Sequence, residues 1–200
     1  MAQLRFPLFF SLIAALGVAG ISPDHAQPTG IDALEDVGYW RDLCRLQAAA
    51  GEYEDAQAAC EQAIALAPEE GDIWAQHSGI LVNLEAFPDA IASANRSLSF
   101  DPENSLAITY QCVSYTALGE TEIALDKCND ALRVNGSWGS ENPALAWRYR
   151  GQILAQAQQH DLALVAYERT LLLEQDDSQT LTRQCEAYVA LERSRDAIEA

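Results

Sequence analysis

Cysteine is the residue type in this sequence whose spacing most directly suggests chemistry. Cys44 and Cys60 are 16 residues apart, Cys112 and Cys128 repeat the same interval, and Cys185 follows further along the chain. Paired thiols form structural disulfides, pack as small buried residues, act as redox switches or ligate metals. No pair of cysteines or histidines has the close Cys-x-x-Cys type of spacing of a zinc site, so we expect no metal. The first three interpretations remain.

The sequence contains no pattern typical of a catalytic site. His25, His77 and His160 lie far apart, and there is no glycine-rich phosphate loop, nucleophile elbow or two-histidine metal helix. Carboxylate runs such as residues 52–55 are typical of solvated helix faces. We therefore predict a chain that is not an enzyme and uses no cofactor.

The balance of charge restricts the partners that the chain can bind. Its 200 residues include 12 Lys and Arg against 30 Asp and Glu, which gives a formal net charge of −18, and 49% of the residues are hydrophobic. A surface this acidic repels phosphate, which excludes nucleic acid and anionic membranes as expected partners. The apolar content is enough for a buried core, so the chain is not a disordered acidic tail.

The N-terminal segment has the pattern of an export signal. Arg5 is followed by an apolar run from Phe6 to Ile21, which is shorter than the roughly 20 apolar residues of a spanning helix. Small and polar residues come next, so residues 1–26 are predicted to be a secretory signal, with a retained membrane anchor as the alternative. The mature protein would then be periplasmic or secreted, where disulfides persist, with residues 27–36 as a linker or N-terminal cap.

The elements that must position the cysteines follow from an internal repeat of 34 residues. The chain matches itself at this interval in several pairs: Trp40 and Trp74, Ala56 and Ala90, and Pro68 and Pro102. Between Ala124 and Ala163 the interval grows to 39, which indicates an insertion in the Gly- and Ser-rich stretch 133–143. Each unit contains two stretches with apolar and small residues at helical spacing, and no long stretch alternates with period two. The fold is predicted to be all-α.

The repeat resembles the tetratricopeptide repeat (TPR). The family pattern of Trp, Leu and a small residue in the first helix, then Ala, Ala and Pro in the second, is matched most fully by Trp40, Leu43, Cys44, Ala56, Ala63 and Pro68 and by Trp74, Ser78, Leu81, Ala90 and Pro102. The resemblance implies a right-handed superhelical solenoid of antiparallel helix pairs whose first helices line a concave face. About five repeats are expected, the last incomplete, near 37–70, 71–104, 105–138 with the insertion, 144–177 and 178–200.

The repeat frame brings the paired cysteines to facing positions. Cys44 and Cys112 take the small-residue site of a first helix, whereas Cys60 and Cys128 take a site where the family prefers an aromatic ring. In an antiparallel helix pair with a short turn, sites equally distant from the turn face each other, within reach of the roughly 4.4–6.8 Å Cα separation of a disulfide. We predict two structural disulfides, each stabilising the fold by about 3 kcal/mol in the chain-entropy model.

Charge also separates the two kinds of helix. The expected first helices hold five arginines against three acidic residues, so the predicted concave face is slightly basic in an acidic protein. The residues predicted to point into this groove and bind a partner are Arg41, Arg45, Gln76, Asn83, Tyr110, Arg148, Tyr149, Gln152 and Arg183. Arg and Tyr are favoured in recognition, and Arg suits carboxylates. In the alternative interpretation these arginines only balance nearby acids.

The function predicted from these features is that of an exported scaffold, for example in envelope assembly, which binds a protein or extended peptide, acidic or carboxylate-bearing. TPR proteins that clamp a peptide carboxylate use Lys and Asn in three successive units, and Leu106 and Tyr110 stand where the third cations would be. Two alternatives are the non-catalytic N-terminal region of a larger exported enzyme and a redox-responsive protein. Trp138, in the insertion, either folds back over the joint between units or anchors a partner.

Overall fold

A computed structural model describes residues 35–139 and 141–193. In this part the chain forms nine α-helices and no strand: α1 (Val37–Ala50), α2 (Tyr53–Leu66), α3 (Gly71–Asn83), α4 (Phe87–Phe100), α5 (Ser105–Ala117), α6 (Thr121–Val134), α7 (Ala144–Gln156), α8 (His160–Leu173) and α9 (Ser178–Ala190). The prediction of an all-α fold is confirmed. The predicted signal, most of the predicted linker and the end of the fifth unit lie outside the described residues.

Local sequence sets the start and end of these helices. Asp36, Asn104 and Asp177 precede α1, α5 and α9, and their side chains accept hydrogen bonds from backbone N–H groups of the first turn, which satisfies donors that the helix itself leaves unpaired. The turn within each helix pair contains one residue with positive φ, and these residues recur with the repeat: Gly51, Glu85, Gly119, Gln158 and Glu192. Every pair therefore reverses direction in the same way.

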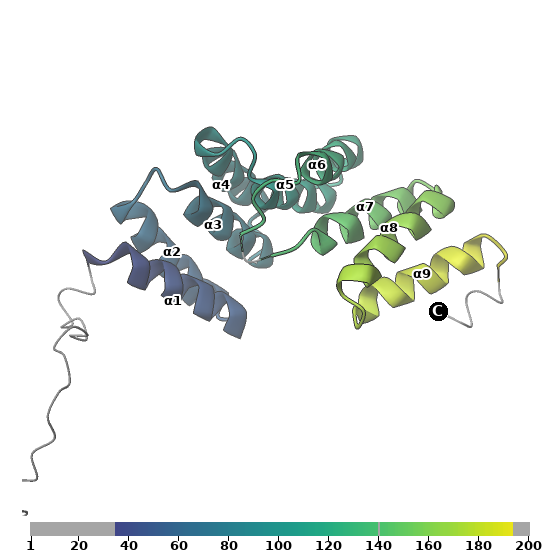
Figure 1. Cartoon of the computed structure of the whole chain (residues 1–200), viewed down its shortest axis with the longest axis horizontal. Helices are drawn as coiled ribbons and strands as arrows, with labels where there is room; N and C mark the ends of the chain where they lie inside the picture. The colour runs from purple at the N-terminus through teal and green to yellow at the C-terminus, as the bar shows by residue number, and fades with distance from the viewer. Residues whose placement is uncertain (1–34, 140, 194–200) are drawn as a thin grey trace, which may run out of the picture.

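The helix pairs stack side by side into an arch (Figure 1). The odd-numbered helices contact one another from unit to unit, α1 with α3, α3 with α5, α5 with α7 and α7 with α9. In the described part no comparable contact joins two even-numbered helices. Because the inner side of a curved stack is the more crowded one, the first helices of the units form the concave face and the second helices form the outer layer.

Two disulfides hold helix pairs together at the small-residue site. Cys44 of α1 is bonded to Cys60 of α2, and Cys112 of α5 is bonded to Cys128 of α6, with Cα separations of 5.1 and 5.2 Å. All four cysteines are fully buried. The structure thus joins the two predicted pairs at the same position of the first and third units.

The second and fourth units fill the same position without cysteine. In the second unit Ser78 faces α4, and its Oγ donates a hydrogen bond of 2.8 Å to the carbonyl oxygen of Ala90. In the fourth unit Gly151 faces the fully buried ring of Tyr167, and a Cβ atom at Gly151 would overlap this ring. The second and fourth units therefore bring their two helices close together without the disulfide that the first and third units use.

The insertion folds back onto the start of α5. Helix α6 continues through Val134, so irregular structure begins only at Asn135. The backbone N–H of Ser137 donates to the carbonyl oxygen of Glu103, and the N–H of Leu106 donates to the carbonyl oxygen of Ser137, both at 3.1 Å. These bonds fix the loop against the concave side of the third unit.

Trp138 belongs to a core cluster between units. Its ring packs against a cluster formed by Ile108, Ala131 and Ala146, and its Nε1–H donates to Asn135 Oδ1 at 3.1 Å. Of the two roles that the sequence left open, the structure places Trp138 over the joint between the third and fourth units. Separately, none of the helices within the described ranges has the length and apolar character needed to cross a membrane.

The equivalence of the units predicts where a third disulfide would form. Replacing Ser78 and Ala94 together by Cys should give a bonded pair, because these residues occupy the positions that Cys44 and Cys60 hold in the first unit. The new loop should raise the free energy of unfolding by about 2 kcal/mol, that is, about 3 kcal/mol from loop closure less about 1 kcal/mol for the lost Ser78 hydrogen bond. Urea denaturation of this variant and of the native chain, both without reductant, measures this change.

A matched control pairs Ser78→Cys with Ala92→Cys. Ala92 is exposed on α4, two residues from the buried Ala94, so a thiol at this position should stay unbonded to the one at position 78. Mass spectrometry after alkylation without reductant reads both variants. Alkylation at positions 78 and 94 in the first variant would contradict the equivalence of the units.

Candidate peptide-binding groove

A cavity of about 700 Å³ lies on the concave side, between α1, α3, α5 and the insertion. Five of the nine residues predicted for the groove line it: Arg41, Arg45, Gln76, Asn83 and Tyr110. Ile80 and Leu106 add apolar surface, and Gly139 and Glu141 come from the insertion. The volume falls in the roughly 300–1,000 Å³ range of ligand sites.

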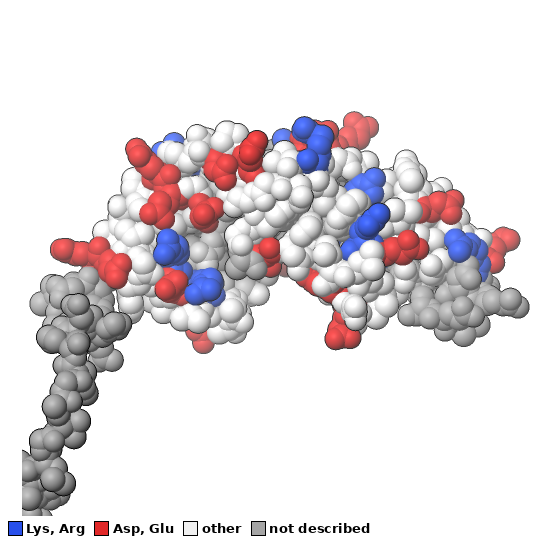
Figure 2. All heavy atoms as spheres, viewed as in Figure 1, with Lys and Arg blue, Asp and Glu red and all other residues white. Residues whose placement is uncertain are grey.

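The α1 wall of the groove presents two arginines that are only weakly engaged. Arg41 Nη1 lies 3.6 Å from Glu70 Oε2, and Arg45 Nη2 lies 3.5 Å from Asp42 Oδ1, with all four side chains 48–60% exposed. Ion pairs this exposed contribute little to stability. Both guanidinium groups can therefore exchange these partners for a carboxylate of a bound peptide. Figure 2 shows the basic patch over α1.

Tyr110 provides an aromatic ring in the groove. Its ring lies across α3 at Gly79, where a Cβ atom would overlap the ring. Burial, together with the nearby charge of Glu141, raises the pKa of the Tyr110 hydroxyl well above its usual value. The side chain therefore stays neutral and offers a ring with one hydrogen-bonding tip, a combination common in recognition surfaces.

Carboxylates line the groove beside the arginines. Asp42, Asp72 and Glu141 are all lining residues, and Asp72 Oδ1 accepts a hydrogen bond of 3.1 Å from Asn104 Nδ2. The expected basic character of the concave face thus holds for the arginine wall, whereas the cavity as a whole has carboxylates and guanidinium groups together. A ligand with both acidic and basic or amide groups fits it better than a purely acidic one.

The other four predicted residues lie outside this cavity. They are Arg148, Tyr149 and Gln152 of α7 and Arg183 of α9, whereas the lining comes from α1, α3, α5 and the loops. Tyr149 packs against the core cluster of Cys112 and Cys128. The structure therefore divides the predicted groove residues between a pocket in the first three units and a separate C-terminal surface.

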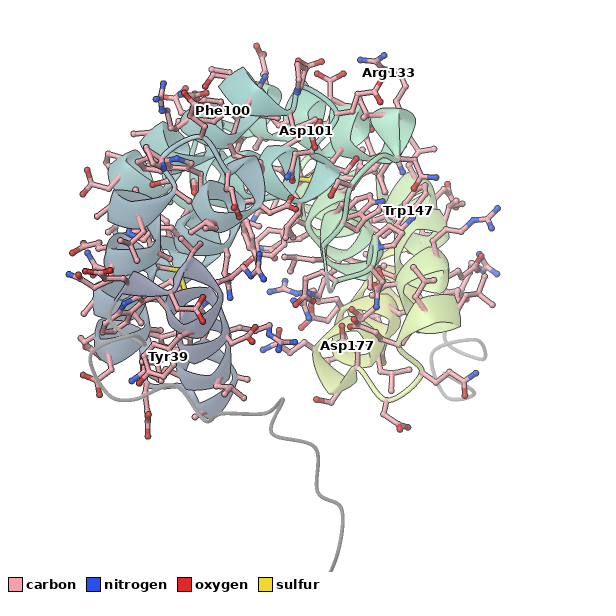
Figure 3. All side chains as sticks on the ribbon, turned by 60° about the vertical axis from the view of Figure 1, so that its left-hand side comes forward. Tyr39, Phe100, Asp101, Arg133, Trp147 and Asp177 are labelled. Atoms are coloured by element: carbon pink, nitrogen blue, oxygen red, sulfur yellow. A yellow bond between two sulfur atoms is a disulfide. The ribbon has the colours of Figure 1, made fainter. Side chains whose placement is uncertain are left out.

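Arg148 takes part in the joint between the fourth and fifth units. Its Nη1 lies 3.1 Å from Asp177 Oδ2, and the two side chains are only 26% and 8% exposed. Burial opposes the charge of Asp177, but hydrogen bonds from Thr180 and Arg148 outweigh it and lower its pKa. Figure 3 shows Asp177 on the inner side of the arch, at the start of α9. Arg148 thus fits the alternative interpretation, in which arginines balance nearby acids.

His77 is a packing residue of the second unit. It is 8% exposed, and its Nδ1 shares a hydrogen bond of 2.9 Å with Ser93 Oγ. Burial lowers the pKa of the ring, against the raising effect of Glu61 and Asp89. No group of three or more His, Cys, Asp or Glu suited to a metal ion occurs in the described residues.

The lining residues that sequence reasoning missed include Gly79, Asp72 and Glu141. Gly79 had a usable signal, because a glycine in the middle of a helix is unfavourable and often marks close packing. Glu141 had none, since its place beside Tyr110 depends on how the insertion folds back.

Two glycines that face tyrosines should respond differently to an added methyl group. Gly151→Ala should lower the free energy of unfolding by about 1–3 kcal/mol, because the fully buried Tyr167 ring cannot move aside. Gly79→Ala should lower it less, because the partly exposed Tyr110 ring can shift into the cavity. Urea denaturation compares the stabilities, and NMR of the tyrosine ring signals follows the shift. Equal destabilisation, with no change in the Tyr110 signals, would contradict this account.

No family model matches the chain, and no curated protein matches it either. Among solved structures, it resembles TTC0263, a thermophilic TPR protein of Thermus thermophilus, with a TM-score of 0.69 at 21% identity over 82% of this chain and 87% of that one. YrrB, a TPR protein with an unusual peptide-binding site, gives a TM-score of 0.56 at 19% identity over 82% of each chain.

A third similar structure contains a bound peptide. The first TPR of Spaghetti (RPAP3), bound to the HSP90 peptide SRMEEVD, gives a TM-score of 0.54 at 22% identity over 62% of this chain and 94% of that one. At these identities the similarity establishes architecture. The chain has a TPR-like fold.

Proposed function

We propose that this chain is an exported interaction scaffold that binds an extended peptide or protein segment in the groove between α1, α3 and α5. The observation that carries the proposal is the pair of half-exposed arginines, Arg41 and Arg45, on the wall of a cavity that also holds the Tyr110 ring. Arg and Tyr are enriched among the residues that dominate the binding energy of protein interfaces, and ligand sites are typically concave with a few polar groups.

The groove assigns different parts of a peptide to different groups. Acidic side chains would pair with Arg41 and Arg45, and an apolar side chain would pack on Tyr110. Asp72 and Glu141, on other walls of the cavity, would accept hydrogen bonds from peptide N–H groups or pair with a basic side chain. The peptide-binding site named for YrrB and the peptide bound to the first TPR of RPAP3 support peptide binding as the function of this chain.

The disulfides support export as part of the proposal. Two buried pairs, Cys44 with Cys60 and Cys112 with Cys128, are bonded, and such bonds persist in the periplasm or outside the cell rather than in a reducing cytosol. An apolar N-terminal run followed by small residues is consistent with this location. A scaffold role in envelope assembly would suit such a protein.

Peptide binding should depend on the arginine wall. A displayed peptide library selected on the full chain should yield peptides that combine acidic residues with basic or amide residues. Their affinity should fall at least tenfold when Arg41 and Arg45 are both replaced by Ala, because each charge-assisted hydrogen bond contributes about 1.5–3 kcal/mol. The control is Arg133→Ala, which removes an exposed arginine on the outer side of α6 (Figure 3). Selected peptides that bind the double variant as tightly as the native chain would exclude this site.

The location can be tested through the thiols. When the protein is extracted from its producing cells and alkylated without reductant, Cys44, Cys60, Cys112 and Cys128 should all be protected. The expected mass shows two intact disulfides. Alkylation of Cys44 and Cys60 would indicate a reducing compartment and would argue against export, while leaving the peptide-binding experiment unaffected.

A further inference from the structure

The outer face of α8 carries an apolar stripe. Leu162, Val165 and Leu172 are 50%, 49% and 71% exposed. Their spacing of three and seven residues places them on one side of the helix. These residues, together with Glu168 and Arg169 between them, are called the α8 stripe below.

The other units show that the exposure of the stripe is intrinsic. The second helices of all four pairs have the same length, so their positions correspond one to one. The positions equivalent to Leu162, Val165 and Leu172 are also exposed in the first three pairs, where a following unit is present. The residues at these positions are mostly polar or small. They are Asp55, Ala58 and Ala65 in α2, Asp89, Ala92 and Ser99 in α4, and Ile123, Asp126 and Arg133 in α6. These positions therefore face away from the next unit, and α8 alone among these helices has three large apolar residues there.

Two opposite charges interrupt the stripe. Glu168 and Arg169 are exposed, and neither forms an ion pair in the part of the chain that the structure describes. Because they are neighbours in sequence on adjacent sides of one helix, each can face a charge on another molecule. An occupant of the stripe needs a positive group opposite Glu168, a negative group opposite Arg169 and apolar residues on both sides.

We propose that this occupant is a second copy of the chain, docked antiparallel along α8. A two-fold axis that passes between residues 168 and 169 places Glu168 opposite Arg169 of the second copy, and Val165 opposite Leu172, and each contact occurs twice. Such self-complementarity is the condition for a two-fold interface. The α8 stripe meets it in both charge and apolar pattern.

The dimer is expected to be weak. Each copy contributes three apolar residues over about 15 Å of helix, which is less than a large permanent interface requires. The net charge of −18 on each copy opposes association, but this repulsion is screened beyond about 8 Å at physiological ionic strength. We expect a dissociation constant in the micromolar range.

The dimer would leave both peptide grooves open. Helix α8 belongs to the outer layer of the arch, whereas the groove is formed by α1, α3 and α5 on the inner side (Figure 1). A dimer would therefore present two grooves at once and bind a partner with repeated segments more tightly than one copy does.

Charge reversal tests the two-fold contact directly. In sedimentation equilibrium of the full chain at about 150 mM salt, Glu168→Arg and Arg169→Glu should each weaken dimerisation at least tenfold, because like charges then face each other. An equimolar mixture of the two variants should form a heterodimer at least as tight as the native dimer, since two arginines of one copy then face two glutamates of the other.

The matched control is Glu61→Arg, which changes the corresponding residue of α2 and should leave dimerisation unchanged. Leu172→Glu should remove dimerisation, with circular dichroism showing that the helices persist. A native chain that remains monomeric up to millimolar concentration would overturn the proposal. So would a mixture that fails to restore association, or self-association that persists unchanged in all α8 variants, because another surface would then be responsible.

Discussion

The structure depends on the close approach of two helices at one position of each unit. A disulfide meets this requirement in the first and third units. The second unit uses a serine hydroxyl bonded to the facing backbone, and the fourth places the large Tyr167 ring against Gly151, which has no side chain. What the described units share is a close contact of their two helices at this site rather than residue identity. Because each unit completes its core against its neighbours, these contacts support the whole stack.

Polar side chains on part of that concave face form contacts between successive units and are not available to a partner. Asn104 caps α5 and donates back to Asp72 of α3, and Asp177 caps α9 while it accepts from Arg148 of α7. Such residues hold one first helix against the next and satisfy buried polar groups. Arg41, by contrast, is half-exposed, and so is its acidic partner Glu70. Whether an inner arginine is structural or available is therefore decided by how far its acid is buried.

Most of the fold could be predicted from the sequence because the repeat acts locally. The helix pairs follow from a pattern that recurs at 34 residues, and the cysteine pairing follows from equal distance to a short turn. The groove was less predictable. Whether a side chain faces into the arch depends on its position in the helix and can be predicted from the spacing of residues. The role of that side chain, however, depends on its neighbours from other units. Arg148 pairs with an acidic residue of the next unit, and Glu141 reaches the cavity only because the insertion folds back. Neither role can be predicted from the sequence of one unit alone.

The sequence by itself determined the helix pairs and the cysteine pairing, because these depend on spacing within one unit. The division between an inner and an outer row of helices was implied by the resemblance to the TPR. Only the tertiary structure decided which inner residues share a cavity. The insertion after α6 returns to α5 through backbone hydrogen bonds, and it brings Gly139 and Glu141 to a pocket otherwise formed by the first three units. That placement depends on contacts between residues more than 30 positions apart. The periodic spacing of residues in the sequence does not predict such contacts.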